Sequence, residues 1–495
     1  MYVNMLKKEE EEDTMPDIRY VCLSDMHLGS DNSVLTPIKP NSIAIDTSQP
    51  GAVMSQLVLC LRELIAHNEG MEKPTLVLNG DILEMDLSDT NKAAMVFERF
   101  IELIFPQEGE ALFNKNILYI PGNHDHHIWE NARETQYVKF IAGIQPGAEL
   151  PAPWHTTKMF APDLVREYFL TSLLRRYPHL RDATVNVVYP NYALVSNDGE
   201  KCIIFSHGHY VESIYSLMST LNSMFFPNRK RPKVVWELEA ENFAWVDFFW
   251  STVGRSGDVG QDIGLFYAKL QDKQQVEKLI ANFSTSWLEQ TNQPKWVEGI
   301  EARGVEWLLD FVFSRLPSFE KNRTDQVLSP DAQNGLQWYM EGPLLEQVRI
   351  ENKQYIPADI TFLFGHTHKP FQQEMNFAGY PALLKVYNSG GWVVDTVQVS
   401  PVHGAAVILI DETLHAITLR MYNQATSLEE YAVRVEECVP PGVTSSAFYD
   451  HINACVNHAS DPWKTFSEAV AEAVRLHAQV LQTKINTTTV ASSHS

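Results

Sequence analysis

Residues 116–125 read Asn-Ile-Leu-Tyr-Ile-Pro-Gly-Asn-His-Asp, an apolar run that ends in a Pro-Gly break and three polar side chains. The same order of apolar run and polar break recurs at four other places along the chain. These runs span residues 19–23, 75–78, 201–205 and 360–364. Helical patterns at residues 55–67 and 92–103 lie between the first runs. This alternation predicts an α/β domain, whose functional groups lie on loops at the carboxyl ends of strands.

The pattern changes after residue 210. Residues 211 to about 350 read as consecutive helices, strand character returns from residue 360, and residues 405–410 and 414–421 are predicted to form a hairpin. We therefore predict one α/β domain interrupted by a helical insertion. The predicted parts are a disordered acidic N-terminus at 1–16, the α/β domain at 17–210 and 346–425, the insertion and candidate lid at 211–345, C-terminal helices at 426–485, and a disordered tail at 486–495.

Composition excludes several classes of protein. The 495 residues carry a formal charge of −23, and 44% of them are hydrophobic, enough for a large core. An acidic chain repels polyanions, so general nucleic-acid binding is not expected. The five scattered cysteines form no Cys-x-x-Cys pair, which favours a reducing compartment over a disulfide framework or a thiolate zinc site. With no signal-peptide pattern and no long apolar run, we expect a cytoplasmic protein without a membrane span.

The polar side chains after the apolar runs are typical metal ligands. If the segments are extended, Asp25-x-His27 and His366-x-His368 each point two side chains the same way, toward one ion. Nitrogen and oxygen ligands without sulfur suit first-row divalent ions at a hydrolytic site. Seven ligands are enough for two ions if one carboxylate bridges them. The predicted ligands are Asp25, His27, Asp81, Asn123, His207, His366 and His368.

This ordered set resembles the calcineurin-like metallophosphoesterase superfamily. The family pattern is D-x-H, G-D, G-N-H-[DE], H and G-H-x-H, and all five blocks are present in that order between residues 25 and 368. The resemblance implies a four-layer sandwich, in which two mixed β-sheets are flanked by helices, here with a large helical insertion and a helical C-terminal tail. It also implies a dinuclear site with manganese, iron or zinc at the sheet edge.

The resemblance assigns a role to each matching position. One metal takes Asp25, His27, Asp81 and His368, and the other takes Asp81, Asn123, His207 and His366, so that Asp81 bridges the two ions. His124 faces the substrate as a general acid or as a donor to the phosphoryl oxygen. Asp125 is expected to orient His124. Asn388 resembles part of a segment that often follows the last block, and it receives no catalytic role.

Several neighbouring polar residues have simpler interpretations. His209 competes with His207 as a ligand, and the family pattern favours His207. His126 and His127 are interpreted as structural. Glu84 and Asp86 are predicted to cap the following helix rather than to bind metal.

The nearest motifs within the superfamily are those of the branch that includes the UDP-diacylglucosamine hydrolases of lipid A synthesis. Ser24 to Gly29 and Asn79 to Glu84 carry this likeness. The sequence departs from that branch at His124, where those enzymes have arginine, and in its longer insertion. We therefore expect the substrate to be a phosphomonoester or phosphodiester that is small, lipid-like or nucleotide-containing.

The insertion offers two further interpretations. Trp236, Phe243 and Trp250 are spaced by seven residues on one predicted helical stripe, which either forms the core of the insertion or lines an apolar groove over the metals. The only dense basic run, which includes Arg229, Lys230 and Arg231, is either a solvated loop or a clamp for an anionic part of the substrate.

The sequence thus predicts a dinuclear metal-dependent phosphoesterase, in which a metal-activated hydroxide attacks the phosphorus directly and no Ser or Cys nucleophile takes part. One alternative is a nuclease of the double-strand-break repair type, which shares these blocks but is disfavoured by the acidic charge. The other is a non-catalytic scaffold that retains the fold for binding partners. The sequence does not fix an oligomeric state.

Overall fold

The computed structural model describes residues 15–216, 218–220, 232–247, 326–440 and 442–492. The strands form an eight-stranded and a five-stranded sheet. The first sheet contains β1 (Ile18–Leu23), β2 (Thr75–Leu78), β3 (Asn116–Tyr119), β4 (Val165–Glu167), β5 (Thr184–Val187), β11 (Gly404–Asp411), β12 (Ala416–Asn423) and β13 (Arg434–Glu436). The second contains β6 (Asn191–Val195), β7 (Lys201–Ser206), β8 (Asp359–Phe364), β9 (Phe371–Met375) and β10 (Leu384–Asn388).

Both sheets are mixed. In the first, which has the order β13-β12-β11-β1-β2-β3-β5-β4, strands β1, β2, β3 and β5 are parallel and the strands outside them are antiparallel. In the second, which has the order β6-β7-β8-β10-β9, strands β7, β8 and β10 are parallel. The carboxyl ends of β1, β2, β3, β7 and β8 carry the predicted ligand blocks.

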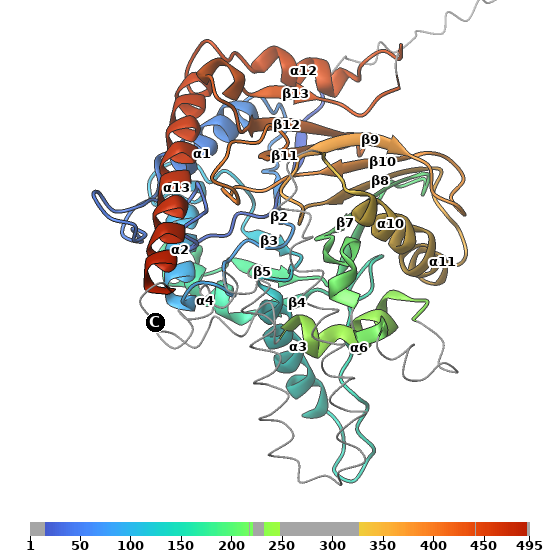
Figure 1. Ribbon diagram of the computed structural model, residues 1–495. Helices are drawn as coiled ribbons and strands as arrows, with labels where there is room; N and C mark the ends of the chain where they lie inside the picture. The colour runs from blue at the N-terminus through green and yellow to red at the C-terminus, as the bar shows by residue number, and fades with distance from the viewer. Residues whose placement is uncertain (1–14, 217, 221–231, 248–325, 441, 493–495) are drawn as a thin grey trace, which may run out of the picture.

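Helices cover the outer faces of the two sheets, as Figure 1 shows for α13 beside α1 and for α10 beside the second sheet. Side-chain alternation produces these layers: Val21 and Leu23 of β1 join the core beneath the helices, whereas Cys22 joins a core shared by both sheets. The α/β class with two mixed sheets, flanking helices and a C-terminal helix is therefore confirmed. The helices are α1 (Ala52–Ile65), α2 (Thr90–Ile104), α3 (His126–Ile141), α4 (Tyr168–Arg175), α6 (Val235–Asp247), α10 (Pro330–Tyr339), α11 (Leu345–Glu351), α12 (Ala447–Cys455) and α13 (Trp463–Ser492).

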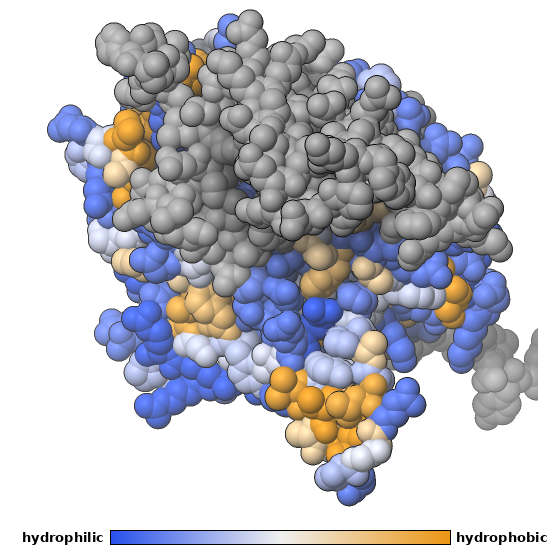
Figure 2. Space-filling model, turned by 60° about the horizontal axis from the view of Figure 1, so that its bottom comes forward, coloured by the Kyte–Doolittle hydropathy of each residue, from blue (hydrophilic) through white to orange (hydrophobic). Residues whose placement is uncertain are grey.

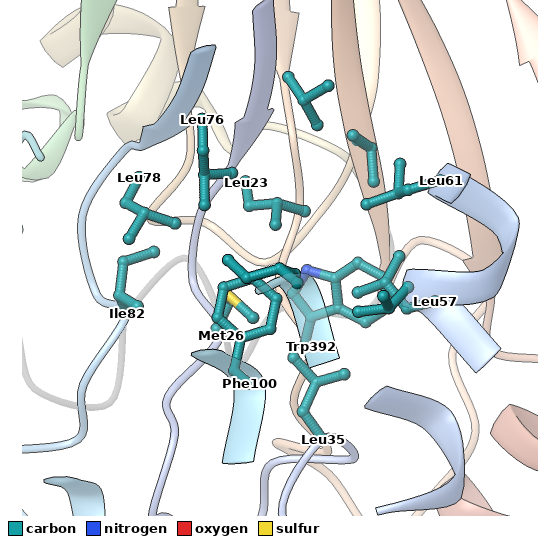
Figure 3. Close-up of a cluster of buried hydrophobic side chains, with 14 of the residues drawn as sticks. Leu23, Met26, Leu35, Leu57, Leu61, Leu76, Leu78, Ile82, Phe100 and Trp392 are labelled. Atoms are coloured by element: carbon teal, nitrogen blue, oxygen red, sulfur yellow. The ribbon is translucent and has the colours of Figure 1, made fainter. Parts of the chain in front are cut away.

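Trp392 anchors the loop after β10 in the largest core. Its fully buried ring lies among apolar side chains that include Leu57 and Leu61 of α1 (Figure 3). Its backbone N–H donates to the carbonyl of Asp25 at 3.0 Å. The core thereby fixes the position of the loop that carries the first predicted ligand.

Several short or terminal elements also differ from the sequence analysis. Strands β4 and β13 have three residues each, too short to show a pattern, and β13 lies in the tail that was predicted to be helical. Helix α13 continues to Ser492, beyond the start of the predicted disordered tail at residue 486. Extending an existing helix needs no new nucleation, so a polar sequence can continue one.

The described parts of the insertion pack against the α/β domain. Leu336 and Tyr339 of α10, and Val348 of α11 just after the insertion, share a core with Phe362 of β8, so these two helices form the outer layer of the second sheet. Within the described part of the chain, no helix is both long and apolar enough to cross a membrane. On the face in Figure 2, the described surface is mainly hydrophilic, with apolar side chains in separate patches.

Candidate metal centre

The loops that follow the parallel strands meet at one edge of the two sheets. The N–H of Asp25 donates to the carbonyl of Gly80 at 2.9 Å, and the side-chain amide of Asn79 donates to the carbonyl of Ser206 in the other sheet at 2.8 Å. These bonds bring together all seven predicted ligands, which come from five segments of the chain and are all buried. The side chains therefore converge because the ends of the strands converge.

The first group of candidate ligand atoms comes from Asp25, His27 and His368, one atom of each lying within 4.8 Å of the others. Nε2 of His27 is 3.2 Å from Nε2 of His368, which is 3.6 Å from Oδ1 of Asp25. The second group, Asp81, His207 and His366, meets the same distance limit. Each group has the size and the donor types of a divalent metal site.

Asp81 belongs to the second group and also lies close to the first. Its Oδ2 is 3.2 Å from Nε2 of His207 in the second group and 3.8 Å from Nε2 of His27 in the first. Oδ1 of Asn123 lies 3.1 Å from the same His207 nitrogen. One carboxylate thus faces ligands of both groups, which is the placement that a bridging ligand requires.

The backbone at these residues is unusual. Five of the ten described non-glycine residues with positive φ are predicted ligands: Asp25, His27, Asp81, His366 and His368. The assumption of extended segments was therefore wrong, because both Asp-x-His and His-x-His lie in irregular loops after the strands and have residues with positive φ. Positive φ costs on the order of 1–3 kcal/mol for most residues and is concentrated at functional sites.

Close backbone approach explains two of the glycines in the sequence blocks. A Cβ atom on Gly122 would collide with the carboxylate of Asp81, and one on Gly365 would collide with that of Asp25. Glycine at these positions lets the carboxylates pack directly on the chain.

Glu84 lies between two imidazoles. Its Oε2 is 3.0 Å from Nδ1 of His27, and its Oε1 is 3.0 Å from Nδ1 of His124. The prediction that Glu84 caps the next helix was wrong, because that helix begins at Thr90 after the N-cap residue Asp89. Asp86 is not a cap either; it is buried, with its Oδ2 3.9 Å from Nδ1 of His124.

Asp125 does not have the predicted contact with His124. Its carboxylate accepts hydrogen bonds from the N–H of Gly122 at 2.6 Å, from the N–H of Ile82 at 2.8 Å and from the hydroxyl of Tyr119. Asp125 therefore holds the loops after β2 and β3 together, and the carboxylate that contacts the His124 ring belongs to Glu84.

The sequence analysis also did not predict two carboxylates that contact imidazoles of the candidate centre. Oε1 of Glu212 lies 2.9 Å from Nε2 of His366, and Oδ2 of Asp395 lies 2.6 Å from Nδ1 of His368. Carboxylates in such positions orient ligating imidazoles. Neither residue belongs to a sequence block, so only the position of Glu212 shortly after His207 offered any signal.

Buried charges shift the ionisation of the site. Burial raises the pKa of the Asp25 carboxyl to about 7, although His207 and His27 oppose this rise. Burial disfavours the charged form of His207, but the Asp81 carboxylate outweighs it and raises the pKa of the imidazole to about 9. Burial also opposes ionisation of Asp81, yet His207, His124 and His27 lower its pKa well below the usual range. The neighbouring imidazoles thus favour the ionised form of the Asp81 carboxyl, which is the form that a metal ligand needs.

The other nearby histidines lie outside the two groups. His209 is fully buried, its ring centroid is 6.0 Å from that of His207, and burial lowers its pKa. His126 and His127 face Asp247 of α6, at 3.2 Å and 3.7 Å from its Oδ1.

The predicted substrate contacts are only partly described. Arg229, Lys230, Arg231 and Trp250 lie outside the described residues. Phe243 is buried against α3, with the Arg133 guanidinium 4.1 Å from its ring centroid, whereas Trp236 is 38% exposed. The two therefore do not share one buried stripe, because α3 contacts α6 near the end of that helix.

A groove of about 1230 Å³ lies between α6 and the α10–α11 region, and Trp236 and Trp338 line it. None of the seven predicted ligands lines this groove. It is therefore not the predicted apolar groove over the metals.

The chain matches no protein-family model, and it matches no curated protein sequence at a significant level.

Proposed function

We propose that this protein hydrolyses a phosphoester with the help of two divalent metal ions held by Asp25, His27, Asp81, Asn123, His207, His366 and His368. The observation that carries the proposal is the position of Asp81, whose carboxylate faces imidazoles of two separate buried ligand groups. The positive φ values at five of these residues support a functional rather than a packing role.

The donor set fits such ions. Imidazole nitrogen, carboxylate and amide oxygen are the ligands of hydrolytic manganese, iron and zinc sites. When bound, two ions of this kind activate water and stabilise charge on the phosphoryl oxygens. The resemblance of the ordered blocks to calcineurin-like metallophosphoesterases points to the same chemistry.

His124 is the proposed general acid, which donates a proton to the leaving group. Glu84 contacts Nδ1 of this imidazole at 3.0 Å, which leaves Nε2 as the nitrogen available to the substrate. The ring packs edge-on against that of His27 with centroids 4.8 Å apart, so it adjoins the first ligand group. A histidine in this place donates a proton to the departing oxygen.

The test combines metal analysis with turnover. Wild-type protein loaded with Mn²⁺ should bind at least two ions per chain and hydrolyse nitrophenyl phosphate or bis-nitrophenyl phosphate. Asp81→Asn should lose bound metal and activity, whereas Asp163→Asn, at an exposed site, should retain both. Only trace transition metal, with no activity restored by Mn²⁺, would contradict the proposal.

A panel of monoesters, diesters and nucleotide-lipid diphosphates would then identify the substrate class. Bound ions at the candidate centre without turnover of any substrate in the panel would favour the alternative of a non-catalytic scaffold.

A further inference from the structure

A second cluster of possible ligands lies where α6 meets α3, and it shares no residue with the centre described above. It consists of His127 and Glu130 in the first turns of α3 and Asp247 at the end of α6. One ligand atom from each lies within 4.8 Å of the other two. Figure 1 shows the two helices side by side below the sheets.

We infer that His127, Glu130 and Asp247 form a separate binding site for one divalent transition-metal ion, which fastens the insertion helix α6 to the α/β domain. Residues three apart lie on the same face of a helix, so His127 and Glu130 present their side chains together. The third ligand comes from a different element, and the ion therefore links two elements far apart in sequence.

The distances suit coordination. Nδ1 of His127 is 2.9 Å from Oε2 of Glu130 and 3.7 Å from Oδ1 of Asp247. Ligands at the usual Zn–N and Zn–O distances of about 2.1 Å are separated by about 3.4 Å in a tetrahedral site. The observed separations lie on either side of this value, so small side-chain rotations complete the geometry.

Charge and access also fit a cation. With neutral imidazoles, the two carboxylates match the charge of one divalent ion. The three side chains are between 11% and 24% exposed, which leaves open positions for water and a route for the ion.

Neighbouring groups hold the ligands in place. Nδ1 of His126 lies 3.2 Å from Oδ1 of Asp247, as in the outer contacts that orient ligating groups at metal sites. On the same helices, Phe243 packs against the ring of His126 at a centroid distance of 4.8 Å. The contact between α3 and α6 is therefore formed by packed side chains and does not depend on the ion alone.

The experiment is metal counting and thermal denaturation with Zn²⁺ as the probe. Glu130→Gln removes one ligand charge and keeps the shape of the side chain; Glu134→Gln makes the same change at an exposed position one turn along α3 and serves as the matched control. Asp247→Asn is a second test from the other helix. Unchanged melting temperatures in chelator would show that the variants fold.

We expect Glu130→Gln and Asp247→Asn each to bind one ion fewer than the wild type and to lose part of the Zn²⁺-dependent rise in melting temperature. Glu134→Gln should match the wild type, and phosphoester turnover is not needed as a readout. An ion count for Glu130→Gln equal to that of Glu134→Gln would overturn the inference, whatever the result for the dinuclear centre.

Discussion

Oε1 of Glu84 lies 3.0 Å from Nδ1 of His124, and the other oxygen of the same carboxylate lies 3.0 Å from Nδ1 of His27. Glu84 is thus the connection between the proposed general acid and a proposed metal ligand. The imidazoles hold its pKa well below the usual range although burial opposes this, so it acts as an acceptor for both rings.

Glu84→Gln is expected to lower kcat or metal affinity by about 10–100-fold, the usual effect of removing a carboxylate that orients a metal-site histidine. An amide offers only one acceptor oxygen, so it cannot hold both rings. Steady-state kinetics and elemental analysis measure the two effects, with the exposed Glu72→Gln as control. Wild-type values of both kcat and metal affinity would show that Glu84 contributes only to packing.

His124→Ala should leave the metal content nearly intact and lower kcat by about 10²–10⁴-fold if His124 protonates the leaving group. The loss should be smaller for nitrophenyl esters than for alkyl esters, because nitrophenolate leaves without a proton. Rates for a series of leaving groups test this. Loss of bound metal in the variant would instead identify His124 as a ligand.

Glu212→Gln should weaken binding of one of the two ions by about 10–100-fold, because Glu212 is 2.9 Å from the ring of His366 and orients it. Competition with a chelator measures the affinity of each ion. The matched change at the exposed Glu200 should have no effect on either. Equal weakening of both ions would argue against a specific action on His366.

Glu239→Gln should stabilise the protein increasingly as pH rises. Burial raises the pKa of the Glu239 carboxyl from 4.5 to about 8, so the folded state keeps a proton that the unfolded state loses between these values. The free energy of unfolding of the wild type therefore falls with rising pH, by at most about 1.4 kcal/mol per unit from this group.

The glutamine variant lacks this ionisation but still accepts the hydrogen bond from the Tyr189 hydroxyl, which is 2.9 Å from Oε2 in the wild type. Denaturant unfolding at pH 5, 6.5 and 8 should show the difference between the two proteins grow. A difference that is constant with pH would mean that Glu239 is already ionised in the folded protein.

The sequence contains enough to predict the strand ends that carry polar groups. Periodicity located β1, β2, β3, β7 and β8 to within one or two residues, because their buried faces produce long apolar runs. It did not reveal β9, whose polar sequence Phe-Gln-Gln-Glu-Met forms an edge strand. Such a strand depends on pairing with β10 rather than on its own pattern.

At the candidate centre, too, the sequence determined some features and the tertiary structure decided others. The residue types at the candidate centre were determined by the sequence itself, since Asp25, His27 and the later blocks occupy fixed places after the strands. The tertiary structure decided how these side chains are oriented and what surrounds them. The pairs Glu212–His366 and Glu84–His27 join residues 154 and 57 positions apart, and each is determined by how the sheets and loops pack. Local patterns contain no information about such contacts, because they depend on the folded arrangement of distant segments.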